Sequence, residues 1–65
     1  MTRVYVRHVR AAGFCIPGLR IWCKERGFSF KDFIRNGIEA EKLVVLNDAM
    51  ASKAVELAER EDSGR

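Results

Sequence analysis

Residues 2–10, "TRVYVRHVR", decide whether the fold contains a β-sheet. Apolar and charged side chains alternate along this stretch. One side of the alternation carries Val4, Val6 and His8, and the other carries Arg3, Tyr5, Arg7 and Val9. A period of two residues is typical of a half-buried β-strand. The stretch therefore predicts one N-terminal strand and an α+β fold.

No second segment shows the same alternation, so the predicted strand has no evident partner within the chain. An unpaired strand leaves backbone N–H and C=O groups without hydrogen bonds. Pairing with the same strand of a second copy, or with a sheet edge of another protein, would satisfy those groups. We therefore expect a homo-oligomer, in the simplest case a homodimer, or a complex with another protein.

The chain after the strand carries helix start and stop signals. Pro17 suits the first position of a helix, and Gly27 suits the left-handed residue that ends it, with Phe28 folding back onto Cys23. Ser29 predicts the N-cap of a second helix, which ends at residues 36–37. Three phenylalanines in this region are expected in the core: Phe28, Phe30 and Phe33.

The C-terminal half keeps apolar residues at helical spacing. We expect a short helix near 39–45 and a longer one from about 48 to 61, with Asp48 in the capping position, or else one unbroken helix. The fold class is thus one N-terminal strand followed by three or four short helices. Residues 1–62 form a single small domain in this prediction, and residues 63–65 form a frayed tail.

Composition limits the classes of protein that this chain can represent. A chain of 65 residues makes one domain with a thin core, while its 48% hydrophobic content argues against intrinsic disorder. Residues 1–10 lack the apolar region of a signal peptide, and an apolar run such as Val44–Leu46 is far too short to span a bilayer. We expect a cytoplasmic protein with no membrane segment.

The charge is distributed unevenly along the sequence. Residues 1–35 carry eight Lys or Arg and two acids, a net +6, and residues 36–65 carry four Lys or Arg and seven acids, a net −3. Such an asymmetry favours contact with nucleic acid, contact with an acidic protein surface, or head-to-tail self-association. Solvated faces that recognise nothing are the simpler alternative.

The stretch "CIPGLRIWC", residues 15–23, is the segment that most resembles an active site. If a helix begins at Pro17, Cys15 and Cys23 lie roughly 10 Å apart along its axis, too far for a disulfide. With His8 they are also too few for a structural zinc site. A thiol nucleophile, Cys15 or Cys23 with His8 as its base, remains an alternative. We expect no enzyme activity, metal, cofactor or small-molecule substrate.

A basic strand followed by helices resembles the order of ribbon-helix-helix repressors, whose paired strands enter the major groove. In that alternative Arg3, Tyr5 and Arg7 face the DNA. The chain departs from the pattern because "AAGFCIP", residues 11–17, separates the strand from the helix.

A wider pattern covers residues 4–58. It reads Cys15-x-x-Gly18-x-Arg20-x-Trp22, then Gly27-Phe28-x-Phe30-x-x-Phe33-Ile34-x-x-Gly37-Ile38, then Leu43, Asp48-Ala49-x-Ala51 and Val55-x-x-Ala58. This order resembles small uncharacterised proteins of tailed bacteriophages and prophages, a group with no assigned activity. The resemblance implies a phage accessory or virion-associated protein that acts by binding, in the host cytoplasm or the virion.

We therefore predict a non-enzymatic protein that binds another protein through its basic N-terminal half. The residues expected at the contact are Arg3, Tyr5, Arg7, Arg10 and Arg20. A ribbon-helix-helix-like DNA-binding regulator is the second hypothesis, and a thiol enzyme that uses Cys15 is the third.

Overall fold

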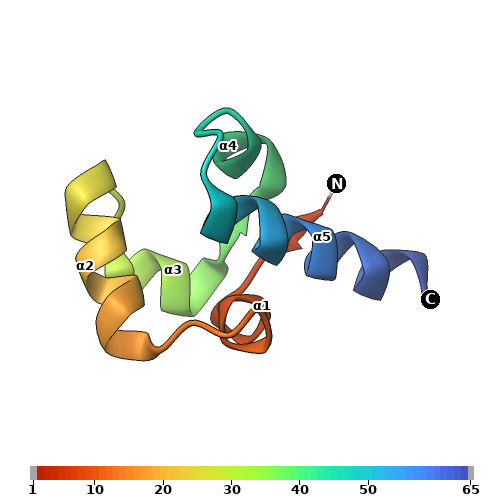
Figure 1. The fold of residues 1–65 in the computed structure, drawn as a ribbon, viewed down its shortest axis with the longest axis horizontal. Coiled ribbons are helices and arrows are strands. Elements are labelled where there is room, and N and C mark those ends of the chain that lie inside the picture. The colour runs from red at the N-terminus through yellow and green to blue at the C-terminus, as the bar shows by residue number, and fades with distance from the viewer. Residues whose placement is uncertain (1, 65) are drawn as a thin grey trace.

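The computed structural model describes residues 2–64, which fold into five helices and one small sheet (Figure 1). In chain order the elements are β1 (Arg3–Val4), α1 (Val6–Ala11), α2 (Ile16–Arg26), α3 (Phe30–Asn36), β2 (Ile38–Glu39), α4 (Ala40–Val44) and α5 (Ala49–Ser63). The predicted α+β class is confirmed in its coarse form, since the molecule is mostly helical with one two-stranded antiparallel sheet.

The prediction of a strand over residues 2–10 is wrong beyond its first part, because only Arg3–Val4 are strand and α1 follows directly. The strand pattern placed Val9 on the side of the arginines, whereas in a helix Val6 and Val9 share one face, and Val9 is buried. No sheet partner extends past Val4, so helical hydrogen bonds satisfy the following backbone groups. This change raises the helix number above the three or four expected.

The partner of β1 lies in the same chain. Arg3 pairs with Glu39 and Val4 with Ile38 in an antiparallel register, and the N–H of Ala40 donates to the carbonyl of Thr2 at 3.0 Å. Two residues are too few to show a period of two, which is why the sequence does not reveal β2. The unpaired strand that led us to expect an oligomer is therefore absent from the described residues.

Gly37 permits the close approach of β1 to the end of α3. Its φ of 71° and ψ of −172° lie in a region that only glycine adopts readily. A Cβ at this position would lie 2.6 Å from the carbonyl oxygen of Val4 and 2.8 Å from Cδ1 of Tyr5. The pairing of β1 with β2 therefore depends on the absence of a side chain at residue 37.

The predicted ends of α2 and α3 are confirmed. α2 ends at Gly27, which has a φ of 76°, and the N–H of Phe28 donates to the carbonyl of Cys23 at 2.9 Å. α2 starts at Ile16, one residue before Pro17. The Oγ of Ser29 accepts from the N–H of Asp32 and so caps α3.

The prediction of two C-terminal helices rather than one is also confirmed. α4 and α5 are separated by residues 45–48, where Asn47 has a φ of 51°, and Asp48 caps α5 as expected. α5 runs to Ser63, two residues past its predicted end. Arg65, the last residue of the predicted frayed tail, lies outside the described residues.

α5 organises the core, because it contacts α1, α4 and β1, while α2 packs against α3 at one end of the molecule (Figure 1). Of the three phenylalanines, Phe33 is fully buried, and Phe28 and Phe30 pack against the core from partly buried positions. The largest fully buried side chains are Phe33, Leu19, Leu43, Val4, Val9 and Cys23. Within residues 2–64, no helix has the length and apolar character needed to cross a membrane.

We predict that Gly37→Ala lowers the free energy of unfolding by about 3 kcal/mol, since it adds backbone strain of ~1–3 kcal/mol to a steric clash. Gly27→Ala is the matched control. Gly27 also has a positive φ, but nothing lies within 4 Å of its missing Cβ, so a loss of about 1 kcal/mol is expected. Urea unfolding of both variants measures the difference. Equal losses would contradict a special role for Gly37.

Candidate functional site

Arg3, the first predicted contact residue, is engaged within the molecule. Its Nε donates to the carbonyl of Asn36 at 2.8 Å, and its Nη2 donates to that of Gly37 at 3.2 Å. Its Nη1 lies 3.8 Å from the carboxylate of Glu39. Arg3 therefore supplies hydrogen bonds to carbonyl groups at the end of α3, which helical bonds leave unsatisfied.

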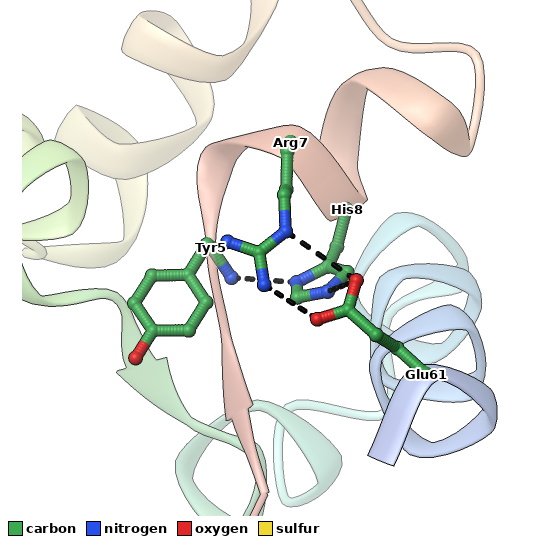
Figure 2. Close-up of polar contacts among 4 residues, drawn as sticks. All are labelled: Tyr5, Arg7, His8 and Glu61. Atoms are coloured by element: carbon green, nitrogen blue, oxygen red, sulfur yellow. Dashed lines mark hydrogen bonds and ion pairs between the residues drawn. The ribbon is translucent and has the colours of Figure 1, made fainter. Parts of the chain in front are cut away.

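Tyr5 and Arg7 belong to a polar cluster between α1 and the end of α5, together with His8 and Glu61 (Figure 2). The guanidinium of Arg7 lies between the ring of Tyr5 and the carboxylate of Glu61. Its Nη2 donates to Oε1 of Glu61 at 2.5 Å, and its Cζ lies 4.8 Å from the centre of the Tyr5 ring. Arg7 thus joins α1 to α5.

His8 is buried and both of its ring nitrogens have partners. The N–H of Tyr5 donates to Nδ1 at 2.9 Å, and Nε2 lies 3.1 Å from Oε2 of Glu61. Because Nδ1 accepts, the ring proton sits on Nε2, which donates to the carboxylate. The thiol hypothesis required His8 as a base for Cys15 or Cys23, but these contacts direct the ring to Tyr5 and Glu61.

The cluster holds Glu61 in its ionised form. The hydrogen bond from Arg7 is the largest cause, and with the bond from His8 it lowers the pKa of Glu61 from 4.5 to about 2, against the opposing effect of burial. Opposite charge and donated hydrogen bonds both favour a carboxylate over the neutral acid. The Glu61 carboxylate therefore stays negatively charged at any pH well above 2.

The other two predicted contact residues, Arg10 and Arg20, are exposed. Arg10 lies on α1 and has no ion pair within the described residues 2–64. Arg20 lies on α2, and its Cζ is 5.1 Å from the centre of the Phe30 ring on α3. The structure thus separates the five residues: Arg3, Tyr5 and Arg7 make internal contacts, whereas Arg10 and Arg20 face solvent.

Further exposed cations lie near Arg20 on α2 and α3. Lys24 follows Arg20 by four residues on α2, and Lys31 and Arg35 are four residues apart on α3, so each pair lies on one helix face. None of these side chains has a carboxylate partner within residues 2–64. We define the α2–α3 surface as Arg20, Lys24, Lys31, Ile34 and Arg35. The four-residue spacing of these basic residues could have indicated this surface from the sequence. The prediction placed the contact on the N-terminal strand instead.

A second polar cluster joins α2 to the start of α5. Oδ2 of Asp48 accepts from the Trp22 indole at 3.2 Å and from the N–H of Ala51 at 3.1 Å, and Oδ1 accepts from Arg26 at 2.9 Å. Arg26 also lies over the Trp22 ring, and the same ring stacks on that of Phe28. Asp48 thus caps α5 and fixes α2 beside it.

Burial by itself would raise the pKa of Asp48. The hydrogen bonds from Ala51 and Trp22 and the charge of Arg26 reverse that effect, so the pKa lies below its usual value of 3.8. The predicted cap accounts for Asp48, a polar residue at the start of the apolar pattern of α5. Its contacts with Trp22 and Arg26 were not predicted, because these partners precede it by 26 and 22 positions in the sequence.

The two cysteines differ in environment. Cys15 is exposed, and its Sγ accepts from the N–H of Gly18 at 3.4 Å, which caps α2. Cys23 is buried, and burial raises the pKa of its thiol. Cys15 borders a mainly apolar hollow of about 260 Å³ between α2 and the start of α5. Among residues 2–64, no three His, Cys, Asp or Glu side chains are placed to hold a metal ion.

We predict that Glu61→Gln removes part of the acid sensitivity of folding. A pKa that folding lowers means that Glu61 contributes stability fully above pH 4.5 and loses it as the pH falls towards 2. Unfolding in urea between pH 7 and pH 2.5 should show a flatter profile for Glu61→Gln than for the wild type. Glu56→Gln is the control, since its surface pair with Arg60 contributes about 0.3–0.5 kcal/mol. Parallel profiles for Glu61→Gln and the wild type would contradict the role of the cluster.

We predict that Asp48→Ala lowers the free energy of unfolding by about 2 kcal/mol, since it removes a helix cap together with the partner of Trp22 and Arg26. Ser29→Ala, which removes a cap alone, should cost about 1 kcal/mol or less. Chemical denaturation with tryptophan fluorescence measures both losses, because Trp22 is the only tryptophan. A loss for Asp48→Ala no greater than that for Ser29→Ala would show that the contacts with α2 contribute nothing.

No protein family, curated protein or solved structure matches this chain. The function is therefore inferred from the charges and contacts of the chain's own residues.

Proposed function

We propose that this chain is a small non-enzymatic binding protein whose α2–α3 surface attaches to an acidic protein partner. One observation carries the proposal. Four cations of this surface lack a carboxylate within residues 2–64, and on α3 the sequence places Ile34, an apolar side chain that is 54% exposed, between Lys31 and Arg35. The cations attract and orient an acidic partner, while Ile34 adds an apolar contact.

The proposed surface differs from the one that the sequence favoured. Arg3 and Arg7 carry charge, but their donors already bind carbonyls of residues 36–37 and the carboxylate of Glu61. A partner would have to break these bonds to use them. Of the five residues predicted at the contact, the proposed surface keeps Arg20. The other cations of this surface are Lys24 of α2 and Lys31 and Arg35 of α3.

A binding role rather than catalysis is supported by the contacts of His8, whose ring nitrogens both serve the junction of α1 and α5. The setting of a phage accessory or virion-associated protein, in the host cytoplasm or the virion, rests on the resemblance of residues 4–58 to small phage proteins. The resemblance implies a protein that acts by binding, and binding of an acidic partner is consistent with that role.

Nucleic-acid binding is the second candidate function, because phosphates would also be attracted by unpaired cations. The ribbon-helix-helix form of this idea required paired N-terminal strands in the major groove. Here β1 pairs with β2, and Arg7 belongs to α1. A nucleic acid would therefore contact the α2–α3 surface and Arg10 instead.

We predict that the double variant Lys31→Glu/Arg35→Glu binds a synthetic peptide of alternating Glu and Leu at least tenfold more weakly than the wild type. Two reversed charges turn attraction into repulsion at the centre of the surface. Fluorescence anisotropy of the labelled peptide measures the affinity. Lys53→Glu, a reversal on α5 outside the surface, should leave binding nearly unchanged and is the matched control.

The same titration with a labelled DNA duplex separates the two candidates. Binding to DNA that falls steeply with salt, without binding to the peptide, would replace the protein partner by a nucleic acid. Equal peptide affinities for the double variant and Lys53→Glu would contradict the α2–α3 surface as the site. Circular dichroism of each variant verifies that the fold is retained.

A further inference from the structure

Two exposed apolar side chains lie side by side in sequence at the end of α4. Val44 is 57% exposed and Val45 is 79% exposed. Both lie on the helix face of Glu41, three and four residues earlier, and Glu41 is exposed as well. We call Glu41, Val44 and Val45 the α4 patch. It combines a negative charge with two apolar side chains.

α3 carries the same spacing with the opposite charge. Ile34 and Arg35 follow Lys31 by three and four residues, and all three side chains are exposed. We call them the α3 patch, which is the α3 part of the α2–α3 surface. Each patch therefore offers apolar contact area beside charge, and the signs of the two charges are complementary.

Nearby residues strengthen the negative charge of the α4 patch. Glu39, Glu41 and Glu59 line one hollow, so three carboxylates lie on this side of α4. Lys42, the adjacent cation, lines a different hollow together with Asp32 of α3. The cation of α4 thus faces the space between α3 and α4, and Glu41 faces away from it.

This arrangement also sets the geometry of contact. Asp32 and Lys42 face the hollow between the two helices, and the α3 and α4 patches occupy the other faces of their helices. One copy can therefore present its α3 patch to one neighbour and its α4 patch to another. Contacts between two different patches are head-to-tail.

We infer that the α3 patch of one copy docks on the α4 patch of a second copy, with Ile34 against Val44 and Val45 and the Lys31 and Arg35 charges against Glu41. This inference rests on the proposed function, that the α2–α3 surface binds an acidic protein surface, and it names that surface. Covering exposed valines removes apolar area from water, while the charges set the register.

The size of the patches limits the strength of the contact. The described chain exposes 4477 Å² in all, and weak, transient interfaces bury less than about 1,200 Å² in total. Two three-residue patches belong to that class. The association should therefore depend on concentration and weaken as salt screens the charges.

Two single charge reversals, Arg35→Glu and Glu41→Arg, test the inference in the full chain. Arg35→Glu leaves its α3 patch with no net charge to attract the acidic α4 patch, and Glu41→Arg has two basic patches, so each alone should associate at least tenfold more weakly than the wild type. An equimolar mixture should regain association, because the basic α3 patch of Glu41→Arg meets the acidic α4 patch of Arg35→Glu. Sedimentation velocity over a concentration series measures the mass, and Lys53→Glu is the control.

The outcomes separate the inference from the proposed function. A wild-type mass that stays at 7.4 kDa at every concentration, or variants that associate as the wild type does, overturns the inference. If such a monomer still binds the Glu-Leu peptide, the proposed function stands without the inference. If it binds no peptide either, both are contradicted. Circular dichroism confirms that loss of association is not loss of fold.

Discussion

The contact between β1 and β2 across Gly37 is the constraint on which the rest of the molecule depends. The pairing fixes the N-terminus beside the middle of the chain, with Val4 opposite Ile38. Only a glycine at position 37 leaves room for the carbonyl of Val4 and the ring of Tyr5. From that point α1 starts at Val6, with Tyr5 in the N-cap position, and β1 and α1 both contact α5. A two-residue sheet thus orders elements that are far apart in sequence.

α5 is held at both ends by carboxylates. Asp48 at its start accepts hydrogen bonds from Trp22 and Arg26 of α2, and Glu61 near its end accepts from Arg7 and His8 of α1. Both carboxylates have lowered pKa values. The bonds from Arg7 and His8 lower that of Glu61, and the N–H of Ala51 in α5 itself, together with Trp22 and Arg26 of α2, lowers that of Asp48 against the opposing effect of burial. For a chain of 65 residues with a thin core, such directed bonds specify which helix lies beside which.

These internal bonds decide which charges remain for recognition. The charge asymmetry of the sequence becomes an asymmetry in space, because α2 and α3 lie at one end of the longest axis and the C-terminal end of α5 lies at the other (Figure 1). Arg3 and Arg7 of the N-terminal segment stabilise the fold, while Arg10 and the cations of α2 and α3 face solvent. The proposed binding through α2 and α3 rests on this division of roles, and the proposed docking on a second copy rests on the opposite charge of α4.

Local signals in the sequence determined most helix boundaries. Gly27, Ser29, Gly37 and Asp48 act within one turn of their own positions, and each ends or caps a helix as predicted. The alternation in residues 2–10 also indicated the α+β class, and the positions of the charged residues determined the charge asymmetry. Tertiary structure alone decided that residues 6–11 are helix, since the choice depended on how far β2 extends beside β1. It alone decided, too, that Arg3 and Arg7 bind other residues of the chain while the cations of α3 stay unpaired within residues 2–64, because hydrogen bonds between residues more than thirty apart leave no local pattern.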